Sequence, residues 1–193
     1  MADNKFSNKA ILVTGAASGM GLATSILLLQ QGAQVIMCDI NSPGLTSSIA
    51  SLNSDSASRV LKQHMDVTDR ASVRAGIDAA KSTFGHLDGI ANFAGTGGHQ
   101  LGVEPVWQTS DEEFDFIVDL NLKGAFHVLS ESLEPGVLTD GSCVVHVGSQ
   151  YSLQSFKNGA VFTAAKHAAL GMARAAAKEL RRGSESTACF REW

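Results

Sequence analysis

The chain of 193 residues carries 15 Lys and Arg against 19 Asp and Glu, a net charge of −4, and 44% of its residues are hydrophobic. This composition excludes a disordered chain, and the absence of a basic run argues against a nucleic-acid partner. The three cysteines lack metal-ligand spacing, so we expect no bound metal. The first ten residues do not resemble a signal peptide and no apolar run has the roughly 18 residues of a membrane span, which predicts a cytoplasmic protein without a membrane partner.

Short apolar runs alternate with amphipathic stretches along the chain. The apolar runs predict buried strands at 10–14, 34–38, 60–65, 87–93 and 142–147. The stretches between and after them predict helices at 21–31, from 42 onward, at 69–84, from 110 to 133, and at 159–180. Such alternation is typical of an α/β fold, a Rossmann-like doubly wound parallel sheet covered on both faces. The run at 60–65 is the least apolar, so we place it near a sheet edge.

Helix ends are marked by turn and capping residues. Gly32 and Gly85 stand where helices commonly stop. Ser42 followed by Pro43 predicts a capped helix start, and Ser110 with Glu113 forms a capping box. The Ser-rich stretch after residue 46 gives a weak signal.

The domain organisation follows from where this pattern ends. Residues 1–180 are predicted to form a single Rossmann-type domain. Residues 181–193, RRGSESTACFREW, have neither strand nor helix periodicity, and we interpret them as an irregular tail.

A glycine-rich loop, TGAASGMG, joins the first predicted strand to the first predicted helix. Gly15 permits a tight turn, Gly19 lets backbone N–H groups approach a pyrophosphate, and Gly21 lets the helix lie close to the strand. The helix N-terminus then faces the phosphates. The loop therefore predicts dinucleotide contacts at Gly15, Ser18, Gly19, Met20 and Gly21, and the alternative is a glycine-rich turn without a ligand.

Asp39 lies at the end of the second predicted strand, 18 residues after Gly21. A carboxylate there can accept hydrogen bonds from the adenosine ribose hydroxyls and would repel a 2′-phosphate. No Lys or Arg occurs in the glycine loop or at positions 40 and 41 to offset that repulsion. We therefore predict NAD rather than NADP as the cofactor. A solvated strand-end acid or a helix cap is the alternative for Asp39.

The glycine spacing resembles that of the short-chain dehydrogenase/reductase family, and further landmarks follow in that family's order over roughly residues 9–180. Asp66 and Val67 follow the third strand, and the stretch Asn92-Phe93-Ala94-Gly95 is similar to the family's Asn-Asn-Ala-Gly turn. The resemblance implies that the cofactor is contacted by Asp66, Val67, Asn92, Ala94, Gly95 and Lys166.

The resemblance also implies a catalytic set. Asn121, Ser149 and Lys166 match the family's catalytic Asn, Ser and Lys, whereas the position of the catalytic Tyr is occupied by Phe162. In the family the phenol transfers the substrate proton, the Ser hydroxyl binds the substrate oxygen, and the Lys lowers the phenol's pKa and holds the nicotinamide ribose. Phe has no proton to transfer, and general acid–base catalysis contributes roughly 10²–10⁴-fold, so turnover should be impaired while the cofactor site stays intact.

Four other side chains near the predicted catalytic positions could donate a proton in place of the missing phenol. Tyr151 lies two residues after Ser149, Thr163 and His167 adjoin the motif but are rotated about 100° around the helix, and His146 lies on the fifth strand. None matches a family position, so an ordinary loop, helix or strand role is favoured for each.

The ending of the chain is a second departure from the family, whose members usually continue through a further strand, a cofactor-contacting loop, a substrate-covering segment and a last strand. A splice variant, a frameshift or a wrongly assigned gene end would each produce such an ending. The fifth strand would then be an exposed edge, an association hazard. Members of the family commonly dimerise through the two helices that match 111–133 and 159–180. The resemblance and the exposed edge together predict a homo-oligomer.

Two functions remain open at this point. The first is an NAD-dependent oxidoreductase acting on an alcohol/ketone pair of a small organic or secondary-metabolite-like substrate. The second is a catalytically impaired protein that binds the cofactor or a partner, which Phe162 and the shortened C-terminus favour.

Overall fold

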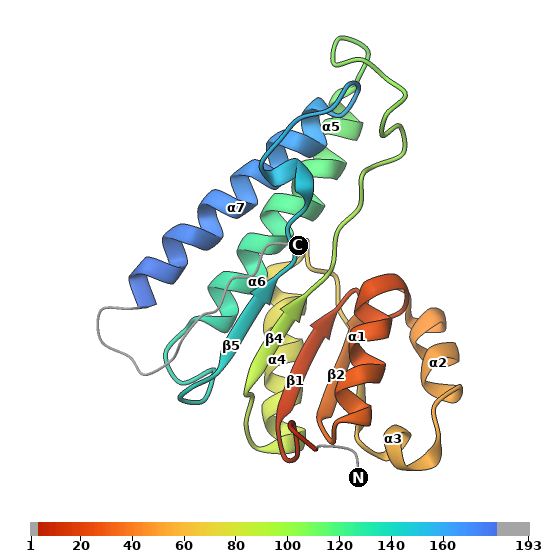
Figure 1. Ribbon diagram of the computed structural model, residues 1–193, viewed down its shortest axis with the longest axis vertical. Coiled ribbons are helices and arrows are strands. Elements are labelled where there is room, and N and C mark those ends of the chain that lie inside the picture. The colour runs from red at the N-terminus through yellow and green to blue at the C-terminus, as the bar shows by residue number, and fades with distance from the viewer. Residues whose placement is uncertain (1–3, 181–193) are drawn as a thin grey trace.

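A computed structural model describes residues 4–180. Its centre is a five-stranded parallel sheet in the order β3-β2-β1-β4-β5 (Figure 1). This confirms the predicted Rossmann-like fold, with β3 at one edge and β5 at the other edge of the described sheet. The strands are β1 (Ala10–Thr14), β2 (Gln34–Asp39), β3 (Val60–His64), β4 (Gly89–Asn92) and β5 (Cys143–His146).

Helices follow the strands in sequence as the alternating pattern predicts. Their bounds are α1 (Gly19–Gln30), α2 (Ser42–Ala50), α3 (Ser54–Ser58), α4 (Arg70–Phe84), α5 (Asp111–Val118), α6 (Gly124–Ser132) and α7 (Ala160–Leu180). A π-helical turn, Asp119–Lys123, joins α5 to α6, and a short 3-10 turn, Gln150–Ser152, follows β5.

Three local predictions need correction. The predicted helix from 110 to 133 starts at its Ser110 cap but is interrupted by the π-helical turn. The cap of α2 is Asn41 rather than Ser42, because the Asn41 side chain accepts the Gly44 N–H at 3.0 Å. The Ser-rich stretch contains a further helix, α3, which begins with an Asn53 cap of the same kind.

The core forms on both faces of the sheet, because successive strand residues point to opposite sides. One face, which includes Leu12, Ile36 and Val144, packs against residues of α4, α6 and α7. The other, which includes Val13 and Met37, packs against residues of α1 and α2 (Figure 1). Beyond α1, the second face carries an apolar groove of about 750 Å³ over β1, β4 and β5.

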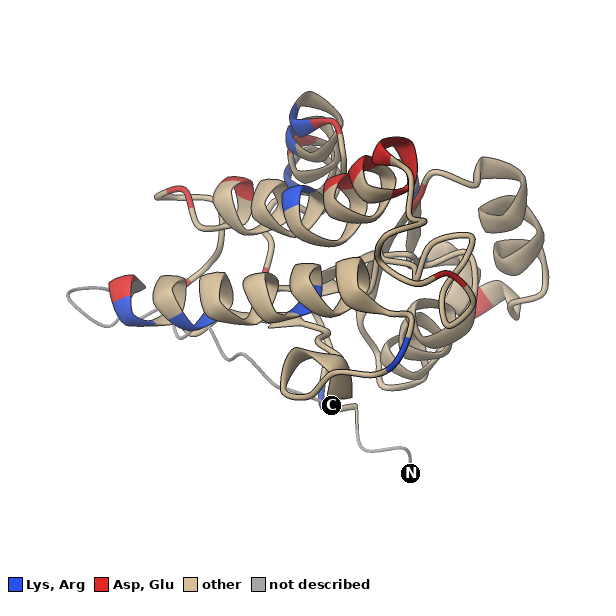
Figure 2. Cartoon of the chain, turned by 90° about the horizontal axis from the view of Figure 1, so that it is seen from above, with Lys and Arg blue, Asp and Glu red and all other residues tan. Residues whose placement is uncertain are grey.

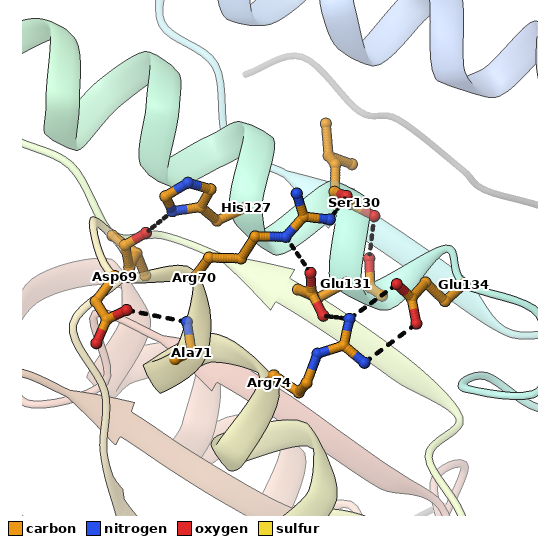
Figure 3. Close-up of polar contacts among 11 residues, drawn as sticks. Asp69, Arg70, Ala71, Arg74, His127, Ser130, Glu131 and Glu134 are labelled. Carbon is orange, nitrogen blue, oxygen red and sulfur yellow. Dashed lines mark hydrogen bonds and ion pairs between the residues drawn. The ribbon is translucent and has the colours of Figure 1, made fainter.

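Charged side chains hold the outer helices in place. Glu131 on α6 is 2% exposed, and its carboxylate is paired with the guanidinium groups of Arg70 and Arg74 on α4 (Figure 3). Arg74 also reaches Glu134 at 2.8 Å. At the start of α5 the acidic residues 111–113 gather at the helix N-terminus, whose partial positive charge they offset (Figure 2).

Candidate active site

A cleft of about 630 Å³ opens at the carboxyl ends of β1, β2 and β4. Ligands of open parallel α/β sheets bind in the crevice outside the carboxyl ends of the strands. The cleft is lined by ten of the residues predicted to contact a cofactor: Gly15, Ser18, Gly19, Met20, Gly21, Asp39, Asp66, Val67, Ala94 and Gly95. Segments more than 70 residues apart in the sequence therefore meet in one site.

Two glycines of the loop, Gly15 and Gly21, lie too close to other backbone to carry a side chain. Gly15 has a φ of +66°, and a Cβ atom at this residue would lie 3.1 Å from the Ala94 nitrogen. A Cβ atom at Gly21 would lie 2.2 Å from the carbonyl oxygen of Gly15. Ser18 begins α1 without a capping hydrogen bond from its side chain, so backbone N–H groups at this helix end are available to an anion. The loop therefore fits the pyrophosphate of a dinucleotide.

Asp39 also braces the glycine loop. One carboxylate oxygen accepts the Ala17 N–H at 2.9 Å, and the other accepts the Asn41 N–H at 2.9 Å. The carboxylate lines the cleft at the same time. Because Asn41 caps α2, the alternative of Asp39 as the helix cap is wrong, while its contact with a ribose stays a prediction.

Asn92 lies beneath the cleft and is not among its lining residues. Its side chain is 2% exposed, and its Oδ1 accepts the Thr14 hydroxyl at 2.5 Å. Thr14 in turn accepts the N–H groups of Phe93 and Ala94, each at 3.1 Å. Asn92 therefore holds the strand ends that form the cleft.

The predicted catalytic residues Asn121 and Lys166 meet beside Gly95. A Cβ atom at Gly95 would lie 2.9 Å from Asn121 Oδ1 and 3.4 Å from Lys166 Nζ, so both side chains face this rim of the cleft. The Asn121 amide nitrogen donates to the carbonyl oxygens of Thr96 at 2.8 Å and Ile117 at 2.9 Å. Lys166 is 8% exposed, and this burial lowers the pKa of its ammonium below the ordinary value.

Phe162 precedes Lys166 by one turn of α7. The Lys166 ammonium lies 5.7 Å from the centroid of the Phe162 ring, within the range of a cation–π contact. The ring thus occupies the neighbourhood of the ammonium without offering a proton.

Ser149 follows β5 and begins the 3-10 turn. Its Oγ accepts the Tyr151 N–H at 3.1 Å, and its own N–H donates to Ser152 Oγ at 3.1 Å. The Tyr151 ring lies 4.0 Å from the Phe156 centroid and 6.4 Å from the Phe162 centroid. These three aromatic rings form one apolar cluster next to the catalytic positions.

The cleft also has lining residues that sequence reasoning did not assign. These are Thr14, Ile40, Met65, Thr68, Phe93, Phe116, Asp119 and Leu120. Thr14 directly precedes Gly15, and the last three lie within the five residues before Asn121. Closeness in sequence to a predicted site residue was therefore the only signal available for these four.

Comparison with known proteins places the chain in a family. Residues 9–184 match the family described as short chain dehydrogenase. The chain is 36% identical over 173 residues to the short-chain dehydrogenase/reductase ABA4 of Pyricularia oryzae, covering 90% of this chain and 64% of that relative. It is 34% identical to the levodione reductase of Leifsonia aquatica, covering 91% of this chain and 65% of the relative. The chain belongs to the short-chain dehydrogenase/reductase family and spans slightly less than two thirds of the length of these relatives.

Solved structures agree with this assignment. The structure of levodione reductase superposes with a TM-score of 0.81 at 33% identity, covering 92% of this chain and 68% of that one. A short-chain dehydrogenase/reductase from Burkholderia phymatum in complex with NAD superposes with a TM-score of 0.87 at 23% identity, covering 97% of this chain and 66% of that one, which shows the shared fold.

Neither a membrane-spanning helix nor a cluster of metal ligands occurs in residues 4–180. None of the helices there combines the length and apolar character needed to cross a membrane. Over the same residues, His, Cys, Asp and Glu side chains do not gather in threes or more as a metal site requires.

Proposed function

We propose that this chain is an NAD-dependent oxidoreductase for an alcohol/ketone pair of a small organic or secondary-metabolite-like substrate. The observation that carries the proposal is the cleft, which the glycine loop, Asp39 and Gly95 line, with Asn121 and Lys166 directly beside Gly95. The relatives named levodione reductase, cyclohexanol dehydrogenase and cyclopentanol dehydrogenase support this substrate class.

The residues present fit a nicotinamide dinucleotide, which supplies or accepts a hydride when bound. The glycine loop would hold the pyrophosphate, Asp39 the adenosine ribose, and Lys166 the nicotinamide ribose. Ser149 Oγ already accepts a backbone N–H, so its own O–H can donate to a substrate oxygen. Asn121 orders the rim beside Lys166 through its two backbone acceptors.

A second candidate is a protein that binds the cofactor with little turnover. Phe162 favours it, because a ketone that receives a hydride also needs a proton, and water placed by Ser149 is a poorer donor than a positioned phenol.

Cofactor titration tests the assignment of NAD. NADH should bind more tightly than NADPH, as measured by the change in nicotinamide fluorescence. Asp39→Ala should reduce that preference, whereas Asp55→Ala, on α3 and exposed, should leave it unchanged. Equal or reversed affinities in the unmodified chain would contradict the assignment.

Turnover separates the two candidates. NADH oxidation is followed with a panel of ketones and aldehydes, together with the Ser149→Ala variant. Turnover that Ser149→Ala abolishes supports the enzyme. Tight NADH binding with no turnover on any member of the panel supports the second candidate.

We also propose a cytoplasmic homo-oligomer. Phe114, Phe116 and Phe126 on α5 and α6 are 47%, 40% and 45% exposed, which supplies apolar surface for a second copy. Sedimentation at micromolar concentration should show a dimer or larger species, and a monomer at that concentration contradicts the proposal.

A further inference from the structure

The segment between β3 and α4 forms one wall of the cleft, which is lined there by Met65, Asp66, Val67 and Thr68. This wall lies beside Asp39, because the Met65 N–H donates to the Asp39 carbonyl oxygen at 3.1 Å where β3 pairs with β2. Asp39 is the residue proposed to hold the adenosine ribose. The wall therefore borders the adenosine end of the cofactor site.

Hydrogen bonds within the segment give the wall its shape. One carboxylate oxygen of Asp66 accepts the Thr68 N–H at 2.8 Å and the Thr68 hydroxyl at 2.7 Å. The Asp69 N–H donates to the Asp66 carbonyl oxygen at 3.1 Å, and the Asp66 N–H donates to Ser72 Oγ at 3.0 Å. These bonds join residues 66–72 to one another, so they do not fix the distance of the wall from the helix that covers it.

Helix α6 makes that connection. His127 Nδ1 donates to the Val67 carbonyl oxygen at 2.9 Å, and the two residues are 7% and 4% exposed. Because a carbonyl oxygen can only accept, Nδ1 carries the hydrogen. One turn earlier on α6, a Cβ atom at Gly124 would lie 2.8 Å from Val67 Cγ2, so the helix also packs closely on this side chain. Figure 3 shows the His127 ring directed at the chain beside Asp69.

We propose that His127 is a positioning residue for the adenosine end of the cofactor site, a role that rests on the proposed function. Its hydrogen bond holds the Val67 peptide against α6 and thereby sets where Asp66 and Val67 line the cleft. A buried carbonyl without its donor is costly, so the wall must shift or admit water when the imidazole is removed. Since α6 continues directly from the π-helical turn that carries Asn121, one helix supports both this wall and a predicted catalytic residue.

Two substitutions of His127 test the hydrogen bond. His127→Leu removes the donor and keeps an apolar side chain of similar size, whereas His127→Asn places an amide N–H near the position of Nδ1. NADH and ADP-ribose share the adenosine half, so both should bind about fivefold more weakly to His127→Leu, the effect of one hydrogen bond of about 1 kcal/mol. Both affinities should stay near the unmodified values in His127→Asn. Nicotinamide fluorescence measures NADH binding, and calorimetry measures ADP-ribose binding.

His86→Leu is the matched control. His86 Nε2 donates to the Asn8 carbonyl oxygen at 2.9 Å, and neither residue lines the cleft, so both affinities should be unchanged. Thermal unfolding confirms that the variants are folded. Should His127→Leu not fold, His127→Gln takes its place, because its longer side chain carries the amide past the position of Nδ1. Unchanged affinities, a loss for NADH alone, or an equal loss in His127→Asn overturns the proposal.

A measurement on the free protein separates this inference from the proposed function. The amide hydrogens of Thr68 and Asp69 should exchange with solvent about fivefold faster in His127→Leu than in the unmodified chain, because the wall opens more readily. In His127→Asn they should exchange near the unmodified rate. Equal exchange in His127→Leu and the unmodified chain overturns the proposal. If the unmodified chain binds neither NADH nor ADP-ribose, the proposed function fails, and hydrogen exchange then decides whether His127 holds the wall.

Discussion

The cleft differs from the catalytic corner, by which we mean the predicted catalytic positions Asn121, Ser149, Phe162 and Lys166, in how its chemistry is built. The glycine loop contributes backbone to the cleft at Gly15, Gly19 and Gly21, where the absence of side chains matters. The corner depends on individual side-chain atoms, and at Phe162 the phenolic oxygen expected from the family is replaced by hydrogen. One substitution can therefore impair proton transfer while leaving the surface that binds the cofactor unchanged.

Phe162→Tyr should give the largest effect. A phenol beside Lys166 restores a positioned proton donor, so NADH oxidation with a reactive ketone should rise about 10²-fold or more. Phe162→Leu should give no such rise, and Ser149→Ala should remove the gain in the Tyr variant. Strong turnover in the unmodified chain that Phe162→Tyr does not change would show that another donor acts, and Tyr151 is then the first residue to replace by Phe.

Gly21→Ala should weaken NADH binding at the cleft. Its Cβ atom would lie 2.2 Å from the Gly15 oxygen and 2.7 Å from the Gly15 carbon, so the loop must move. NADH affinity should fall about tenfold or more, because several hydrogen bonds of about 1 kcal/mol each shift together. Gly171→Ala is the matched control: no heavy atom lies within 4 Å of its Cβ position, and Ala in a helix stabilises by about 0.5–1 kcal/mol. NADH affinity retained in Gly21→Ala would contradict the tight fit of the loop.

Glu131→Gln should destabilise the chain without touching either site. It removes the buried carboxylate that pairs with Arg70 and Arg74, and the free energy of unfolding should fall by about 2 kcal/mol (Figure 3). Urea unfolding measures this loss, and NADH affinity should stay unchanged in the folded variant. Glu134→Gln, at a more exposed partner of Arg74, should cost less. Equal losses in the two variants would show that burial of Glu131 contributes nothing.

Asp88 should give the smallest effect, visible through pH. Partial burial raises the pKa of this carboxyl, but hydrogen bonds from the Ala10 N–H, Lys9 and Thr139 outweigh it and lower the pKa below the ordinary 3.8. A lowered pKa stabilises the fold above pH 3.8, and that stabilisation is lost as the pH falls through the folded-state value. Asp88→Asn should therefore be less stable by about 1 kcal/mol or less at pH 7, with the difference shrinking below pH 3.8. A difference independent of pH would point to lost packing instead.

Most of the fold could be predicted from the sequence because strands and helices depend on neighbouring residues. Four of the five apolar runs contain a whole observed strand, and β2 extends one residue beyond its run, to Asp39. Gly32 and Gly85 end their helices with positive φ angles of 89° and 80°. The π-helical turn around Asn121 was not predicted, because one inserted residue scarcely disturbs the 3.6-residue periodicity of the flanking helices. The Ser-rich helix α3 was missed because serine favours caps and turns as readily as helix.

By itself, the sequence determined the glycine spacing, the position of Asp39, the predicted catalytic set and the phenylalanine at position 162, since each is a matter of residue type and spacing. Only the tertiary structure decided that the side chains of Thr14, Asn92 and His146 are hydrogen-bonded to one another across three strands. It also decided that Asn121 and Lys166 face the same point beside Gly95. The physical reason is that the register of parallel strands and the packing of α7 are set by contacts between segments far apart in the chain, which no local pattern records.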